Sequence, residues 1–222
     1  MTRADTATPR DDEPEAPATR GRSRKYTQVM AVIYQAAIEV FASEGLAGAS
    51  TQAIADKAGL SKAQLHYYIE SKEALYRQVM QDIVDAWIAV FGFSDEAFGP
   101  RKVLSDFIRR KMVFSFEHPL RSRIFTIEVM RGAPVLRPMM DAQAGRRTDQ
   151  AVAVIQNWMN QGLMERSDPV LFLFHVWAVT QFYADHAMQV AYYRDVPKSD
   201  DKDREYLIAQ VTEFLLRGAG VK

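Results

Sequence analysis

Apolar residues recur along most of the chain at the three- and four-residue spacing of one face of an α-helix. The pattern is clear over residues 29–41 and returns over residues 75–90. Gly45 suits the left-handed conformation that commonly ends a helix, and the Asp168-Pro169 pair is typical of a helix start. No segment alternates between apolar and polar residues for long enough to form a strand. The pattern therefore predicts an all-α protein.

About nine helices are expected. Their approximate ranges are 27–44, 51–58, 61–68, 71–90, 100–118, 120–131, 135–161, 169–194 and a last helix around 207–215. Residues 1–24 are instead rich in proline and acidic side chains, so they are expected to form a disordered polar tail. The basic residues at its end are either solvated or part of an arm that contacts phosphates. The chain then divides into a three-helix N-terminal domain over 25–71 and a helical C-terminal domain over 72–222.

Composition excludes several classes of protein. The 222 residues are enough to bury a core, and the absence of cysteine excludes disulfides, thiol catalysis and thiolate metal sites. The longest apolar run, residues 170–179, is half the length of a membrane span, and the N-terminus lacks the apolar core of a signal peptide. We therefore expect a cytoplasmic protein with no membrane segment. The formal net charge of zero argues against nucleic-acid binding by bulk charge, but it leaves a locally basic face open.

The second and third expected helices form the most informative unit. They are short and joined by Gly59-Leu60-Ser61, which is the spacing of a helix-turn-helix whose second helix can enter the DNA major groove. The second helix of the pair carries ammonium, amide, imidazole and hydroxyl groups that hydrogen-bond base edges and phosphates. Contacts to bases are expected from Lys62, Ala63, Gln64 and His66, and contacts to the DNA backbone from Arg24, Lys25, Thr51, Tyr67 and Lys72. Two alternatives are that Gln64 only completes a capping box with Ser61 and that Tyr67 packs half-buried.

Residues 29–80 resemble the TetR-type helix-turn-helix of bacterial transcription regulators. The matching positions are Ala36, Phe41, Gly45, Thr51, Ile54-Ala55, Ala58-Gly59-Leu60-Ser61, Leu65, Tyr67-Tyr68 and Ser71-Lys72-Glu73-Ala74-Leu75. Ile69 departs from the usual aromatic residue, and His66 stands where tyrosine or leucine is common, which changes the expected base preference. The resemblance implies a transcription regulator, expected to be a repressor, that binds a palindromic double-stranded DNA operator as a homodimer.

Parts of the C-terminal domain resemble the RutR-type branch of this family, the regulators of pyrimidine utilisation. These parts are residues 122–125, 132–134 and 177–185, together with Trp87. The resemblance implies a small planar effector such as uracil or thymine, and the candidate ligand-binding residues are Trp87, Phe91, Phe125, Trp177, Thr180, Gln181 and Asp185. The four-residue spacing places Trp177, Gln181 and Asp185 on one helix face. Gln181 and Asp185 either pair internally or across a dimer, or Gln181 offers its amide to a lactam edge of the ligand.

The sequence shows no sign of an enzyme, a metal site or a cofactor. The four histidines lack metal-ligand spacing, and no glycine-rich phosphate loop or nucleophile beside a base is present. Glu128 is interpreted as a helix-surface acid, with a site carboxylate as the alternative. The segment around 169–194 and the last helix are apolar on more than one face, which favours a four-helix bundle built from two chains. The alternatives are a regulator of another catabolic pathway with a different effector, a DNA-binding dimer without an effector, and a helical enzyme that shares only the N-terminal hairpin.

Overall fold

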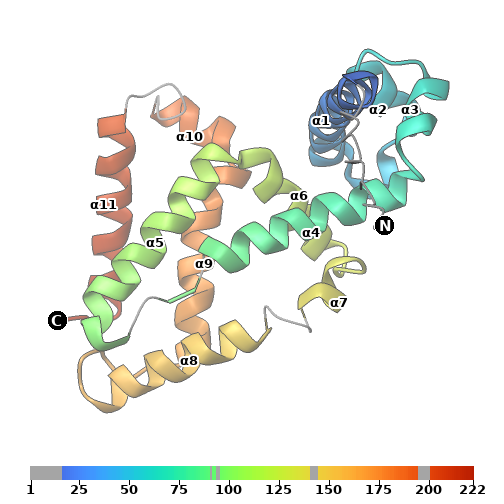
Figure 1. Cartoon of the computed structure of the whole chain (residues 1–222). Helices are drawn as coiled ribbons and strands as arrows, with labels where there is room; N and C mark the ends of the chain where they lie inside the picture. The colour runs from blue at the N-terminus through green and yellow to red at the C-terminus, as the bar shows by residue number, and fades with distance from the viewer. Residues whose placement is uncertain (1–16, 91, 94–95, 141–144, 195–200) are drawn as a thin grey trace, which may run out of the picture.

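The computed structural model describes residues 17–90, 92–93, 96–140, 145–194 and 201–222, and these residues are mostly helical (Figure 1). The helices are α1 (Pro17–Gly48), α2 (Thr51–Lys57), α3 (Lys62–Tyr68), α4 (Lys72–Val90), α5 (Gly99–Glu117), α6 (Pro119–Met130), α7 (Leu136–Met139), α8 (Gly145–Asn160), α9 (Pro169–Asp185), α10 (Ala187–Tyr193) and α11 (Asp201–Gly218), with a 3-10 turn η1 (Glu96–Phe98). The described residues contain no strand, which confirms the all-α prediction.

Helices α1 to α3 and the first half of α4 enclose one apolar core. Ile33, Ala37 and Phe41 of α1 are fully shielded from solvent, as are Ile54 of α2 and Leu65 of α3. Side chains four apart on α1 therefore form the seam against which the two short helices pack. This N-terminal domain lies at the upper right of Figure 1.

Gly45 ends the regular part of α1 and lets the helix approach α6. Its φ of 66° lies in the left-handed region that favours glycine. A Cβ atom at this position would lie 3.2 Å from Cγ2 of Ile127 on α6 and 3.3 Å from the side chain of Arg131, which follows α6. The structure confirms the predicted break at Gly45 and adds the close approach as a second reason for glycine.

Helix α4 connects the N-terminal domain to the rest of the chain and crosses the centre of Figure 1. Helices α6 and α7 pack against α1 and α4, so that Ile124 of α6 and Leu136 of α7 are buried in the N-terminal core. The core of the N-terminal domain therefore continues into the C-terminal domain without a gap. The predicted domain boundary at residues 71 and 72 falls at the start of α4.

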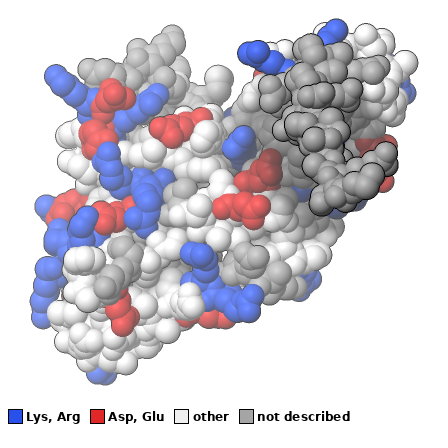
Figure 2. Space-filling model, viewed as in Figure 1, with Lys and Arg blue, Asp and Glu red and all other residues white. Residues whose placement is uncertain are grey.

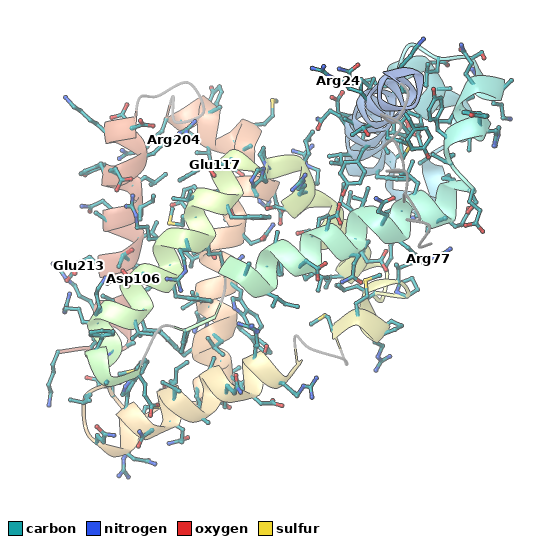
Figure 3. All side chains as sticks on the ribbon, in the orientation of Figure 1. Arg24, Arg77, Asp106, Glu117, Arg204 and Glu213 are labelled. Carbon is teal, nitrogen blue, oxygen red and sulfur yellow. The ribbon has the colours of Figure 1, made fainter. Side chains whose placement is uncertain are left out.

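A second core lies between α5, α8, α9 and α11. Phe107, Trp158, Val176 and Leu215 supply one large buried side chain from each of these helices. At the surface, α5 and α11 are joined by the ion pairs Arg109–Glu205 and Arg101–Glu213. Figure 2 shows acidic and basic side chains intermixed over these two helices, and Figure 3 labels Glu213 on α11 and Asp106 on α5. Such exposed pairs contribute little to stability.

The structure differs from the predicted helices in three places. Helix α1 begins at Pro17, ten residues before the expected start, so residues 17–24 are helical rather than disordered; residues 1–16 lie outside the described part. The helix predicted over 135–161 is divided into α7 and α8. The helix predicted over 169–194 is divided at His186, whose φ of −111° and ψ of 31° are not helical.

Two sequence interpretations also need correction. Glu128 is 2% exposed, so it is a buried carboxylate and not a surface acid. Arg24–Gly48 is long enough and apolar enough to cross a membrane by length and composition alone, although its apolar residues are not consecutive. Its apolar residues form the N-terminal core, however, as in the central helix of many soluble domains.

Candidate functional site

The helix-turn-helix predicted from residues 51–68 is present as α2 and α3. Gly59 adopts a φ of 68°, and the Leu60 N–H donates to the Ala55 carbonyl at 2.9 Å, which reverses the chain within three residues. Ser50 begins α2 by accepting from the Ala53 N–H at 3.0 Å. One side of α3 is held against the core by Leu65, and the other side is open. This arrangement leaves an unobstructed helix face for a macromolecular partner.

The side chains predicted to read bases lie on that open face. Lys62, Ala63, Gln64 and His66 are all exposed. Gln64 also closes the predicted capping box, because its Oε1 accepts from the Ser61 N–H at 2.8 Å. A bidentate contact to adenine uses both the oxygen and the nitrogen of the amide. Such a contact therefore requires Gln64 to release the Ser61 N–H.

The predicted backbone contacts occupy different environments. Tyr67 is 78% exposed and packs edge-on against Tyr68, so its hydroxyl is accessible. Thr51 is half-buried at the first turn of α2, and Arg24 and Lys25 are exposed on α1, where Figure 3 labels Arg24. These four side chains can therefore contact a phosphate group without rearrangement of the core.

Lys72 is tied to the protein itself. Its Nζ donates to the carbonyls of Leu46 and Ala49 at 2.9 and 2.7 Å, which satisfies the end of α1 beyond Gly45. Two of the three ammonium N–H bonds are therefore used by backbone carbonyls. The Glu73 carboxylate lies 3.9 Å from the same nitrogen, so a phosphate contact would compete with it or use the backbone N–H groups at the start of α4.

A cavity of about 510 Å³ lies in the C-terminal domain. Its wall is mostly apolar and comes from α4, α5, α6, α7, α8 and α9. The indole of Trp87 and the ring of Phe125 pack with their centroids 3.8 Å apart, and Trp177 lies on the α9 side. An apolar wall with few polar groups and aromatic faces is typical of a site for a small organic ligand.

Most of the predicted ligand-binding residues line this cavity. Trp87, Phe125, Trp177, Gln181 and Asp185 do so. Thr180 does not: it is fully buried, and its hydroxyl donates to the Val176 carbonyl at 2.7 Å. Phe91 lies outside the described residues.

Sequence reasoning did not find Lys111 or Thr126. Lys111 follows two arginines and looks like part of a solvated face, but it is 4% exposed and lines the cavity. Burial lowers the pKa of its ammonium group to about 8, and the nearby Asp185 carboxylate opposes this shift. The available signal was its position four residues after the buried Phe107 and four before the buried Ser115, on the apolar face of α5.

Glu128 connects the cavity wall to α4. Its Oε2 accepts from the Tyr76 hydroxyl at 2.9 Å, and its Oε1 accepts from the N–H groups of Val135 and Leu136 at 2.6 and 3.2 Å. Tyr76 in turn packs edge-on against Phe41 of α1. One buried carboxylate therefore links the start of α7, which lines the cavity, to the two helices that carry the helix-turn-helix.

Comparison with known proteins identifies both halves of the chain. Residues 33–79 match the family model described as bacterial regulatory proteins, tetR family, and residues 80–222 match that of the YcdC-like protein, C-terminal region. The chain belongs to the TetR family. The HTH-type transcriptional regulators RutR of Escherichia coli and Shigella flexneri are 34% identical to this TetR-family chain over 200 residues, which cover 90% of the chain and 94% of each relative.

Solved structures with lower identity show the same fold. The ketosteroid transcriptional regulator of Mycobacterium tuberculosis has a TM-score of 0.67 at 17% identity and covers 94% of this chain and 98% of its own. A tetR-family regulatory protein from Rhodococcus has a TM-score of 0.68 at 18% identity, over 87% of this chain and 98% of its own. The family model and the RutR relatives, and not these solved structures, confirm the prediction of a TetR-type DNA-binding transcription regulator rather than an enzyme.

Proposed function

We propose that this TetR-family protein is a cytoplasmic repressor that binds a palindromic operator as a homodimer and responds to a small planar effector of the pyrimidine type. The observation that carries the proposal is the pairing of an open recognition helix with a ligand-sized cavity, linked through α4 and α6. The 34% identity to RutR supports the resemblance to the RutR-type branch, and that resemblance implies the pyrimidine class.

In this proposal DNA is read by the open face of α3. Lys62, Ala63, Gln64 and His66 contact base edges, while Tyr67 and Thr51 contact phosphates. Arg24 and Lys25 add cations, and Lys72 positions the start of α4. From residue 20 to residue 75 there are seven basic and five acidic side chains, a difference of 7 − 5 = +2 per chain. The small excess means that local placement, and not net charge, provides the phosphate contacts.

A homodimer is supported by exposed apolar side chains on the last helices. Phe174 of α9 and Phe214 of α11 are 50% and 71% exposed, and Leu171 is 52% exposed. Pairing of these helices with their copies in a second chain would bury side chains that are costly to leave in water. A two-fold dimer then presents two α3 helices to half-sites about 34 Å apart, or a multiple of that distance.

The effector would act by shifting a population of conformations. It must bind one placement of α4 more tightly than the other, because equal affinity for both changes nothing. A coupling free energy of about 1–3 kcal/mol changes operator affinity roughly 5- to 150-fold. Trp87 contributes to the cavity and lies on α4, so it is the proposed coupling residue.

One observation favours a second candidate, a DNA-binding dimer without an effector. Nε2 of Gln181 donates to Oδ1 of Asp185 at 3.1 Å, so two of the polar groups predicted to bind a ligand are paired within the protein. Such pairing satisfies these half-buried polar groups without any ligand.

The test is an operator-binding titration with DNA from the region upstream of the gene. We expect tight retention at low salt and loss of affinity with rising salt, with a salt slope reduced by about one in Lys25→Ala, whose exposed ammonium is proposed to contact a phosphate. Lys102→Ala is the matched control, because Lys102 is exposed on α5 far along the chain from α3. Uracil is then added and should change operator affinity. If the DNA is not retained at low salt, the proposal that the protein regulates this operator is wrong. Retention without a response to uracil favours the second candidate.

A further inference from the structure

The polar atoms on one side of the cavity are joined in a line. Lys111 of α5, Thr126 of α6, and Gln181 and Asp185 of α9 all line the cavity. Lys111 Nζ lies 3.3 Å from Gln181 Oε1, and Gln181 Nε2 lies 3.1 Å from Asp185 Oδ1. The Thr126 hydroxyl donates to the same carboxylate at 3.0 Å. Three helices therefore contribute to one continuous polar strip.

This strip fixes the orientation of the Gln181 amide. A lysine ammonium only donates hydrogen bonds and a carboxylate only accepts them, so Oε1 must face Lys111 and Nε2 must face Asp185. Nε2 also lies 3.3 Å from the Thr126 hydroxyl oxygen, so both of its hydrogens have acceptors within the protein. Gln181 therefore has only its oxygen left for a ligand, and not the donor–acceptor pair expected from the sequence.

We infer that Lys111 and Gln181 together determine the specificity of the cavity by recognising a lactam edge, a ring carbonyl beside a ring N–H. Lys111 donates to the carbonyl, and Gln181 Oε1 accepts from the N–H. The ammonium has three N–H bonds and the amide oxygen has two lone pairs, so their mutual contact uses one N–H bond and one lone pair. The inference rests on the proposed function, because it takes the effector to bind in this cavity.

The surroundings of Lys111 match a flat neutral ring. Its Nζ lies 5.1 Å from the centroid of the Trp87 ring, so a ligand that accepts from it also lies near the aromatic faces of Trp87 and Phe125. The next acceptor along the strip is the Asp185 carboxylate, which repels a negatively charged ligand and attracts a second N–H. Along this strip a neutral lactam satisfies both ends, whereas a carboxylate pairs with Lys111 and is repelled by Asp185; the other cation of the cavity wall is Arg147 of α8.

The experiment is isothermal titration calorimetry on the full-length protein with three probes. Uracil carries the lactam edge, 1,3-dimethyluracil keeps the carbonyls but has no N–H, and benzoate is a flat anion. We expect uracil to bind at least tenfold more tightly than either of the other two. Lys111→Met should weaken uracil binding roughly tenfold to a hundredfold, since a hydrogen bond from a charged donor is lost. Lys102→Met, at an exposed position on the same helix, should bind uracil like the wild type.

Each outcome separates this inference from the proposed function. The lactam assignment is overturned if Lys111→Met binds uracil as tightly as the wild type does. It is also overturned if the wild type binds 1,3-dimethyluracil as tightly as uracil, or benzoate more tightly than uracil. These outcomes leave an effector-responsive regulator intact. Failure of the wild type to bind uracil overturns the pyrimidine effector as well. Thermal unfolding checks that Lys111→Met is folded, and the comparison of uracil with 1,3-dimethyluracil on the wild type decides the matter even if that variant is not.

Discussion

Replacing the buried Lys111 by methionine should stabilise the protein without ligand. Burial lowers the pKa of this ammonium from 10.5 to about 8, so holding the charge inside the folded chain below pH 8 costs about 3 kcal/mol. Methionine fills a similar volume without the charge. The change leaves the Gln181 Oε1 without the Lys111 donor, which costs about 1 kcal/mol. The net expectation at pH 7 is a gain of about 1–3 kcal/mol in the free energy of unfolding.

The pH dependence shows whether desolvation of the charge is the cause. Between the folded pKa of about 8 and the unfolded value of 10.5, the unfolded chain binds more protons than the folded one. Stability of the wild type should therefore rise with pH above 8 relative to the variant. Two other charged groups line the cavity, the Asp185 carboxylate of α9 and the Arg147 guanidinium of α8. The remaining helices that face Lys111 contribute uncharged residues such as Trp87 of α4 and Thr126 of α6. Asp185 and Arg147 are both unchanged in the variant.

The assay is urea unfolding at fixed protein concentration, at pH 7 and at pH 9.5, because dimer stability depends on concentration. The advantage of Lys111→Met should be largest at pH 7 and shrink at pH 9.5. Lys102→Met on the exposed side of α5 is the control and should change stability by less than about 0.5 kcal/mol at both values. A variant less stable than the wild type, or an advantage that does not change with pH, would refute the reasoning.

Two further predictions concern the contacts that join the two domains. Gly45→Ala should lower the free energy of unfolding by about 1–2 kcal/mol, because alanine is strained at a φ of 66° and its Cβ meets α6. Gly218→Ala has open space around it and should be neutral or stabilising in the same urea titration. Equal effects of the two substitutions would contradict this explanation. Tyr76→Phe should lower the free energy of unfolding by about 1–3 kcal/mol, because the buried carboxylate of Glu128 loses a donor. Tyr67→Phe is the control, because its ring is largely exposed, and it should lower the free energy of unfolding by less than about 0.5 kcal/mol in thermal unfolding. A similar loss in Tyr76→Phe and Tyr67→Phe would rule out the buried hydrogen bond as the cause.

The features predicted correctly from the sequence depend on short-range chemistry. The Ser61–Gln64 capping box and the Asp168 cap followed by Pro169 are formed as expected. The left-handed Gly45 also stands where the pattern placed the end of a helix. Each of these features is fixed by residues within about four positions of one another, so the local sequence contains the whole cause.

The features that were missed depend on packing between distant segments. Nothing near His186 in the sequence, neither glycine nor proline, marks the break between α9 and α10. Lys111 and Glu128 look like ordinary charged residues of amphipathic helices, and only the helices packed around them remove them from water. Their neighbours lie about 50 to 70 residues away, as the Tyr76–Glu128 and Lys111–Gln181 bonds show.

The sequence alone determined that this chain is helical, that residues 51–68 expose a recognition helix, and which aromatic and polar residues of α9 share a face. These properties follow from periodicity and capping, which act along the chain. Only the tertiary structure decided that Lys111 meets Gln181 inside a cavity and that Glu128 joins the cavity wall to α4. Burial and desolvation are properties of the space enclosed between helices, and no single helix contains that space.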